Sequence, residues 1–353
     1  MKAVGYQHSL EITQADSLQD IELPTPEAKG RDLLVKIAAV SVNPVDTKVR
    51  MRAQPEAGEY KVLGWDAVGE VVAVGDEVSF YKEGDIVWYA GDLTRQGTNA
   101  EYHLVDERIV GRKPAGLTNA QAAAAPLTAI TAWEMLFDRL SMEKSYGSVH
   151  DSDKARNSDK SYKEQILIIG AAGGVGSILV QLAAKLTDAL VIGTASRPES
   201  QQWVTDLGAD YVIDHRKPLS SELKRIGVKH VSHVISLNAT EQHFSEIAQV
   251  IAPQGKFALI DDPSEPLDIL QLKTKSVSIH WEFMYTRSMY QTEDMAKQRD
   301  LLNEISELID AGTLKTTLGE NYGTINATNL KPAHGDLESG RTIGKIVLEG
   351  FDH

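Results

Sequence analysis

The stretch Gln165–Ser177, QILIIGAAGGVGS, constrains the fold of this chain more than any other. Its apolar run Ile166–Ile169 meets a cluster of glycines, and the apolar-periodic segment Ile178–Leu186 follows at once. This order predicts a buried strand, a tight turn and the start of a helix. Glycines let a backbone approach a pyrophosphate closely, and the free N–H groups at a helix N-terminus bind its negative charge. The stretch therefore predicts a dinucleotide-binding loop.

The loop departs at one position from the usual fingerprint G-x-G-x-x-G, because Ala171 stands where the first glycine belongs. The strand and helix on either side supply the structural context that a lone motif lacks. We expect five residues of the loop to bind the cofactor, namely Ala171, Gly173, Gly174, Val175 and Gly176.

A second predicted strand, Leu190–Ala195, follows the helix, and Ser196 and Arg197 come directly after it. They stand about twenty residues past the last glycine of the loop, where a group that contacts the adenosine ribose belongs. An NAD-binding protein places Asp or Glu there, whereas an arginine favours a 2′-phosphate. We therefore predict NADPH as the cofactor. The alternative is a surface arginine that only caps a loop.

Strands and helices continue to alternate after this point, which predicts a doubly wound parallel sheet of the Rossmann type with helices on both faces. The further predicted strands are Tyr211–Asp214, Val231–Leu237, Phe257–Ile260 and Val277–Trp281. Polar and apolar residues alternate in the last of them, which suits an edge strand that must be paired or covered.

Polar residues at the ends of these strands are further cofactor candidates, because nucleotides bind at the carboxyl edge of an open parallel sheet. His215 is a candidate for stacking on the adenine, and Asn238, close to Ser236, is a candidate for the nicotinamide ribose. The alternatives are an exposed loop histidine and an asparagine that only forms a turn.

The composition is that of a globular protein and excludes several functions. The net charge of -14 argues against broad binding to nucleic acids or anionic membranes. The chain contains no cysteine, which excludes disulfides, thiolate catalysis and cysteine-ligated zinc. No segment approaches the ~18 consecutive apolar residues of a membrane span, and the N-terminal MKAVGYQHS lacks the apolar core of a signal peptide. We expect a cytoplasmic protein with no nucleic-acid or membrane partner.

The first third of the chain is rich in short strand-like runs separated by Gly and Pro, which predicts a small barrel or a curled sheet. These runs are Lys2–Gln7, Leu33–Val42, Ala67–Val74, Asp85–Ala90 and Ala100–Val105. Pro44 keeps the residue before it out of the helical region, so Asn43 is expected at a strand-to-helix corner with its amide free to point into a cleft.

These elements, in this order, resemble the medium-chain dehydrogenase/reductase superfamily, in which a GxDxxGxV-type segment and a later GDxV turn mark the catalytic domain. Here the two motifs are Gly64–Val71 and Gly84–Val87. Asn43–Thr47 is similar to a segment of the zinc-independent quinone oxidoreductases. Together with Leu63–Ala67 and Trp281–Met284, the longer segment Asn43–Arg50 resembles the subgroup labelled zinc-type alcohol dehydrogenase-like proteins.

The resemblance covers essentially the whole chain, up to a closing strand at Gly344–Leu348. It implies a β-rich, partly open barrel catalytic domain over residues 1–127 and 315–353, and a dinucleotide-binding Rossmann domain over residues 128–314. It also implies a homodimer, because the last strand of the nucleotide-binding sheet pairs with its symmetry mate in the family.

The chain departs from the zinc enzymes of the family at two ligand positions. Asn43 stands where they place a cysteine, and Trp65 stands where they place a histidine. A tetrahedral zinc site of nitrogen and sulfur ligands therefore cannot be assembled there, and we expect no metal.

A metal-free site suits an acceptor that delocalises the charge left by hydride attack, so the expected substrate is a quinone or an α,β-unsaturated carbonyl. Asn43 and Tyr89 are the candidate hydrogen-bond donors, and Asp46 and Trp65 are expected to shape the pocket. The resemblance also implies that Thr128 faces the nicotinamide carboxamide. The alternative for Thr128 is a helix kink with a self-bonded hydroxyl.

Two other functions stay open at this stage. One is a metal-dependent alcohol dehydrogenase, and the other is a protein that binds NADPH as a sensor without turnover. The substrate itself is not identified by any motif. The polar stretch 141–164 is expected to be a solvated loop, and we assign it no function.

Overall fold

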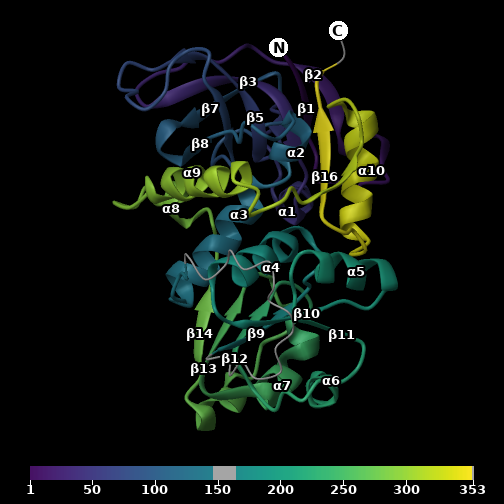
Figure 1. Ribbon diagram of the computed structural model, residues 1–353. Coiled ribbons are helices and arrows are strands. Elements are labelled where there is room, and N and C mark those ends of the chain that lie inside the picture. The colour runs from purple at the N-terminus through teal and green to yellow at the C-terminus, as the bar shows by residue number, and fades with distance from the viewer. Residues whose placement is uncertain (146–163, 352–353) are drawn as a thin grey trace. The chain divides into compact units, whose positions relative to one another are not determined.

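The chain forms two units, which the computed structural model describes over residues 1–145 and 164–351 (Figure 1). The first unit comprises Met1–Ile130 and Met284–His353, and the second comprises Thr131–Phe283. Residues 146–163 of the predicted polar loop lie outside the described residues. Among the described residues, no helix combines the length and the apolar character needed to cross a membrane.

The division differs from the expected boundaries because the first unit, and not the nucleotide-binding one, contains residues 128–130 and the longer segment Met284–Leu314. Its main helix α9 (Lys297–Asp310) packs on strand β8 (Val110–Arg112) so closely that a Cβ at Gly111 would lie 2.6 Å from that of Leu302. The backbone N–H of Arg112 donates to Asn303 Oδ1 at 2.8 Å. The periodicity of α9 predicts a helix, but it contains no information about which sheet the helix covers.

The first unit is β-rich, as predicted. In the described residues it contains a three-stranded sheet in the order β2-β1-β4 and a seven-stranded sheet in the order β15-β16-β3-β5-β6-β8, with β7 paired to β3. The strands not yet given are β1 (Lys2–Tyr6), β2 (Gln19–Glu22), β3 (Asp32–Ser41), β4 (Lys61–Val62), β5 (Asp66–Val74), β6 (Ile86–Tyr89), β7 (Tyr102–Asp106), β15 (Leu318–Asn321) and β16 (Lys345–Glu349).

Helices flank these sheets, and Figure 1 shows α10 running alongside β16. Asp46 fixes the start of the first helix, because its carboxylate accepts the N–H of Asn43 at 2.5 Å. The helices of this unit are α1 (Pro44–Arg52), α2 (Asn119–Ala123), α3 (Pro126–Trp133), α8 (Thr286–Met289) and α10 (Ala327–Glu338), together with short 3₁₀ turns at Ala15–Ser17 and Glu107–Ile109.

The second unit contains, within its described residues, a six-stranded sheet in the order β11-β10-β9-β12-β13-β14. All of its strand pairs are parallel, which confirms the predicted Rossmann sheet. Its strands are β9 (Gln165–Ile169), β10 (Leu190–Thr194), β11 (Tyr211–Ile213), β12 (Val231–Ser236), β13 (Ile251–Leu259) and β14 (Ser278–Trp281).

The helices of this unit connect its strands and cover its core. Apolar residues of the central strands, such as Leu167, Val234 and Phe257, form one buried cluster with Phe244 and Ile247 of the connecting helix α7. Burial on this scale is the main stabilising contribution to such a sheet. The helical segments are α4 (Gly174–Leu186), α5 (Pro198–Asp206), α6 (Leu219–Arg225), α7 (Thr240–Val250), a π-helix at Glu134–Arg139 and a 3₁₀ helix at Ile269–Lys275.

Candidate functional site

The glycine loop joins β9 to α4, as predicted. Gly170 ends the strand with a φ of +83°, a conformation that favours glycine. A Cβ at Gly176 would lie 2.4 Å from the carbonyl oxygen of Gly170, so no larger residue fits there. Gly173 is the N-cap of α4, whose first N–H groups have no partner within the helix. The loop therefore offers backbone donors at the place where a pyrophosphate is expected.

The loop lies at the point where the chain changes direction across the sheet. β9 is followed outwards by β10 and β11, and the chain then returns to β12 on the other side of β9. Asn238 follows β12, and its Oδ1 would be 2.6 Å from a Cβ at Gly170. The carboxyl ends of β9 and β12 thus form the crevice where open α/β sheets bind their ligands, with Asn238 beside the loop.

Two of the predicted cofactor residues have side chains that are buried inside the second unit. Ala171 is fully buried, and its Cβ would be 3.0 Å from a Cβ at Gly193. Ser236 is also fully buried, and its Oγ accepts a hydrogen bond from Thr240 Oγ1 at 2.7 Å. A cofactor contact by Ala171 would therefore involve its backbone, and Ser236 can act only through its neighbours.

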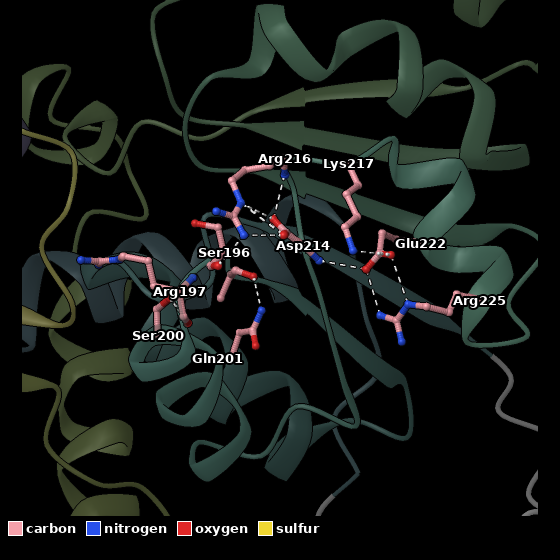
Figure 2. A network of polar contacts seen from close by, with 10 residues as sticks. Ser196, Arg197, Ser200, Gln201, Asp214, Arg216, Lys217, Glu222 and Arg225 are labelled. Carbon is pink, nitrogen blue, oxygen red and sulfur yellow. Dashed lines mark hydrogen bonds and ion pairs between the residues drawn. The ribbon is translucent and has the colours of Figure 1, made fainter.

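The predicted ribose end of the site contains a second arginine (Figure 2). Arg216 Nη2 donates to the carbonyl oxygen of Ser196 at 2.9 Å and to Asp214 Oδ2 at 2.7 Å, while its Nε donates to Asp214 Oδ1 at 3.0 Å. These bonds hold the pKa of Asp214 at about 2. The carboxylate of Asp214 is therefore ionised and forms an ion pair with Arg216.

Arg197 lies on the other side of Ser196 and extends away from Arg216 in Figure 2. It is the N-cap of α5, its backbone N–H donates to Ser200 Oγ at 3.2 Å, and its Nε lies 3.4 Å from Glu199 Oε1. Ser196 and two guanidinium groups thus share the carboxyl ends of β10 and β11. The sequence already indicates Arg216, at the end of this strand, as a further candidate for a phosphate contact, but its pairing with Asp214 was not predicted.

His215 comes directly after Asp214, at the same edge of the sheet. Burial lowers its pKa, so the ring is neutral at pH 7. The ring centroid lies 6.1 Å from that of His243, with the two planes at 71°. Its buried Nδ1 has no hydrogen-bond partner among the described residues. The predicted contact with adenine stays a prediction.

The catalytic candidates of the first unit lie around the start of α1. Asp46 is fully buried, and its Oδ1 accepts the N–H of Gly64 at 2.9 Å. Gly64 has a φ of +91°, so the chain turns sharply there. Burial raises the pKa of Asp46 to about 7, against the lowering effects of the Asn43 N–H and of the Lys345 ammonium. Asp46 therefore joins α1 to the GxDxxGxV segment.

We expected the amide of Asn43 to point freely into a cleft, but it is buried and hydrogen-bonded. The residue is 1 % exposed, its Oδ1 accepts a hydrogen bond from Lys345 Nζ, and its Nδ2 donates to Asp66 Oδ2 at 2.7 Å. The remaining Nδ2 hydrogen has only a 3.5 Å contact with the carbonyl oxygen of Ser41, which is at the limit of a hydrogen bond. A donor role for Asn43 therefore depends on that one hydrogen.

Trp65 and Tyr89 are fully buried as well. Trp65 Nε1 donates to the carbonyl oxygen of Asp92 at 3.1 Å, and its ring meets that of Tyr285 edge-on at 6.2 Å. The Tyr89 hydroxyl lies 3.0 Å from His103 Nδ1, while His103 Nε2 lies 2.9 Å from the carbonyl oxygen of Gln96. Since that carbonyl can only accept, Nε2 carries the hydrogen and Nδ1 accepts from Tyr89.

Thr128 lies in the first turn of α3 and is buried. Its hydroxyl donates to the carbonyl oxygen of Ala125 at 3.0 Å, which is the self-bonded arrangement that was the alternative to a cofactor contact. The hydroxyl oxygen can still accept a hydrogen bond. Asp66 Oδ1 accepts the N–H of Leu127 at 2.7 Å and so fixes the start of the same helix.

The residues around α1 do not fit a zinc ion. Zinc prefers thiolate, imidazole and carboxylate ligands, but the two ligand positions hold an amide bound to Lys345 and an indole with no lone pair to offer. Over residues 1–145 and 164–351, no group of three or more His, Cys, Asp or Glu side chains could hold a metal ion. We therefore derive no catalytic step through a metal.

Comparison with known proteins identifies the family. Residues 29–126 match the alcohol dehydrogenase GroES-like domain, and residues 207–348 match a domain described as zinc-binding dehydrogenase. A zinc-type alcohol dehydrogenase-like protein of Staphylococcus epidermidis is 36 % identical over 99 % of both chains. The 2-methylene-furan-3-one reductase of Solanum lycopersicum is 35 % identical over 99 % of this chain and 79 % of its own.

A solved structure is more similar still. It is a protein from Rhizobium etli CFN 42, provisionally described as a zinc-dependent alcohol dehydrogenase, with 53 % identity and a TM-score of 0.92 over 100 % of this chain and 99 % of that one. These matches confirm the resemblance that the motifs indicated. The chain belongs to the medium-chain dehydrogenase/reductase superfamily and is an oxidoreductase of that superfamily, with zinc-type alcohol dehydrogenase-like proteins among its relatives.

Proposed function

We propose that this oxidoreductase uses NADPH to reduce a quinone or an α,β-unsaturated carbonyl, without zinc. The observation that carries the cofactor assignment is the pair Arg197 and Arg216 on either side of Ser196, at the carboxyl edge of the Rossmann sheet. A 2′-phosphate there would find two guanidinium groups. Asp214, the carboxylate that directly follows β11, is already neutralised by Arg216.

The substrate class is supported by the residues around α1 and by one relative. No strong Lewis acid fits there, so the acceptor must stabilise developing negative charge mainly by its own conjugation. The tomato relative is named as a reductase of 2-methylene-furan-3-one, which is a conjugated ketone. Quinones meet the same requirement, because hydride attack leaves a phenolate.

The reaction needs little from the protein besides positioning. NADPH, when bound, supplies a hydride from C4 of its nicotinamide ring. The hydride bonds to the β-carbon of the enone, the electron pair of the C=C bond moves to the carbonyl oxygen as an enolate, and a solvent proton then completes the α-carbon. We assign the free Nδ2 hydrogen of Asn43 to the enolate oxygen and the hydroxyl oxygen of Thr128 to the carboxamide.

The other predicted residues act less directly in this proposal. Asp46 and Trp65 are buried groups that hold the shape of the site, and Tyr89 is committed to His103. Gly173, Gly174, Val175 and Gly176 supply backbone donors for the pyrophosphate. Asn238 contacts the nicotinamide ribose and His215 the adenine.

We also propose a homodimer, formed by pairing the free edge of β14 with that of a second copy. β14 is the edge strand of its sheet, and its side chains Ile279 and Trp281 are 39 % and 57 % exposed. Two positions apart, they lie on one face of the strand. An edge with exposed apolar residues is unfavourable unless another chain covers it.

Initial rates of NADPH oxidation with a panel of quinones, enones and simple aldehydes test the proposal. We expect turnover with the first two classes and little with aldehydes, and a preference for NADPH over NADH. Tight NADPH binding with no turnover on any acceptor would instead favour a sensor. Turnover that requires added or bound zinc would indicate a metal-dependent alcohol dehydrogenase.

A further inference from the structure

One tyrosine that is not among the predicted site residues lies beside the catalytic candidates of the first unit. Tyr285 directly precedes α8 and is 2 % exposed. Its ring meets the indole of Trp65 edge-on, with 6.2 Å between the centroids and 73° between the planes, which is a favourable arrangement of two aromatic rings. The indole is itself held, because its Nε1 donates to the carbonyl oxygen of Asp92. The contact with Trp65 therefore defines the place of the Tyr285 ring within the first unit.

The backbone of Tyr285 is anchored as well. Its carbonyl oxygen accepts the N–H of Met289 at 2.9 Å and the hydroxyl of Ser288 at 3.2 Å. Ser288 is 1 % exposed, so the short helix α8 forms a buried base for the ring. A side chain that is held through both its backbone and its ring loses little conformational freedom when it binds a ligand. Tyr285 is thus preorganised.

The hydroxyl of Tyr285 lies in a region of negative charge and stays protonated there. Burial raises its pKa well above 10, and the charges of Asp46, Asp66 and Asp92 raise the pKa further. Both oxygens of Asp46 and both oxygens of Asp66 accept hydrogen bonds from other groups. One of those groups is the N–H of Asn43, so the same carboxylate acts on Asn43 and on Tyr285. The hydroxyl is therefore a neutral O–H donor at pH 7 in the region of Asn43.

We infer that the hydroxyl of Tyr285 is a catalytic hydrogen-bond donor, which together with Asn43 Nδ2 binds the oxygen that becomes negative when the acceptor takes the hydride. The inference rests on the proposed function. It gives Tyr285 the role that the sequence analysis assigned to Tyr89, whose hydroxyl is bound to His103. Two donors on one developing oxyanion form an oxyanion hole, and preorganised donors are most effective where water is excluded.

The proton of Tyr285 stays on the tyrosine throughout the reaction. The hydride bonds to the β-carbon, the electron pair of the C=C bond moves to the carbonyl oxygen, and that oxygen accepts the hydrogen bond. The phenol is too weak an acid in this environment to transfer its proton, so solvent protonates the α-carbon. A charge-assisted hydrogen bond strengthens as its acceptor becomes more basic. The contribution of Tyr285 should therefore increase with the basicity of the bound oxyanion.

The first test is the rate of Tyr285→Phe, which removes the hydroxyl and keeps the ring contact with Trp65. At saturating NADPH, kcat for 2-cyclohexen-1-one should fall by about 100-fold, as is typical for the loss of one oxyanion donor. The KM for NADPH should stay within about twofold, because the hydroxyl does not touch the cofactor in this account. Tyr81→Phe is the matched control, since Tyr81 is 7 % exposed in the same unit and donates to the carbonyl oxygen of Val110 at 2.5 Å. It should lower the Tm and leave kcat within about twofold of the wild type.

The second test needs no turnover. The phenolates of 4-nitrophenol and 3,4-dinitrophenol carry a negative oxygen on a conjugated ring and do not react, so their absorbance reports binding to the protein loaded with NADP⁺. Tyr285→Phe should bind 4-nitrophenolate at least about tenfold more weakly than the wild type does. The loss should be smaller for 3,4-dinitrophenolate, which is the less basic oxyanion. A purely structural role of Tyr285 would weaken both phenolates equally.

The outcomes separate this inference from the proposed reaction. If the wild type reduces neither enones nor quinones, the proposed reaction fails, and the phenolate titration still decides whether Tyr285 is an oxyanion donor. A Tyr285→Phe protein with kcat and phenolate affinity within about twofold of the wild type would overturn the inference. Equal losses for the two phenolates, similar losses in Tyr81→Phe, or a wild type that binds neither phenolate would also overturn it.

Discussion

The ammonium of Lys345 and the carboxylate of Asp66 lie 3.2 Å apart in the interior of the first unit, although 278 residues separate them in the chain. The pair joins β16 to β5 and, through the N–H of Leu127, reaches the start of α3. Ion pairs at this depth are costly to desolvate, and their value lies in the geometry that they impose. Here they impose one orientation on the amide of Asn43.

Cofactor preference should depend on the two arginines beside Ser196. Arg197→Ala and Arg216→Ala should each raise the KM for NADPH on the order of 10- to 100-fold, because each removes a charge-assisted contact worth about 1.5–3 kcal/mol. The KM for NADH should change little, since NADH has no 2′-phosphate. Steady-state kinetics with both cofactors measure this.

Arg225→Ala is the matched control for these variants. It makes the same change of charge, but Arg225 is paired with Glu222 at 2.9 Å and lies away from Ser196 in Figure 2. Its KM for NADPH should stay within about twofold of the wild-type value, since it has no phosphate contact to lose. If Arg225→Ala weakened NADPH binding as much as Arg216→Ala, general electrostatic attraction would explain the preference.

The hydroxyl of Tyr89 should matter for stability more than for rate. Tyr89→Phe leaves His103 Nδ1 buried without a donor, and should lower the free energy of unfolding by about 1–3 kcal/mol. We expect kcat to stay within about twofold of the wild type. Urea denaturation and initial rates check the two parts. A loss of kcat of tenfold or more at unchanged stability would make Tyr89 the donor that its sequence position suggested.

A buried pair of carboxyl groups should make the stability fall as the pH rises from about 4.3 to about 9. Arg139 donates to Glu282 Oε2 at 2.8 Å and lies 3.4 Å from Glu134 Oε2. Burial, and then the charge of Glu134, raise the pKa of Glu282 to about 9. The folded protein thus holds a proton that the unfolded chain releases above its ordinary glutamate pKa of about 4.3.

The direction in which stability changes with pH follows from that extra proton of the folded state. The contribution to stability is complete below pH ~4.3 and is lost as the pH rises towards 9, with a slope of at most about 1.4 kcal/mol per pH unit. Glu282→Gln keeps the neutral form and should flatten this part of the profile in urea denaturation at pH 5, 7 and 9. The exposed substitution Glu83→Gln should not. Parallel profiles for Glu282→Gln and the wild type would show that the pair holds no extra proton.

The dimer should depend on the exposed edge of the Rossmann sheet. Trp281→Glu places a charge on the face of β14 that we expect to meet a second copy, and should halve the mass measured by light scattering. Ile86→Glu is the control, because Ile86 is similarly exposed, at 46 %, but belongs to β6 of the first unit. Dissociation by Ile86→Glu and not by Trp281→Glu would place the interface elsewhere.

The parts of the molecule that could be predicted are those specified by neighbouring residues. The strand, glycine turn and helix at Gln165–Leu186 depend on local pattern, and the parallel direction of the strands follows from their alternation with helices. The environment of Asn43 could not be predicted, because its partners Asp66 and Lys345 come from distant strands. For the same reason the helical pattern after Met284 did not show that α9 packs on β8.

The most direct measurement of the central claim is transfer of deuterium from NADPH labelled at C4 to an enone, with protein that has been dialysed against EDTA and analysed for metals. We expect stoichiometric deuterium at the β-carbon of the product from protein with less than about 0.1 equivalent of any divalent metal per chain. Turnover that disappears on chelation and returns with one equivalent of zinc would contradict the account.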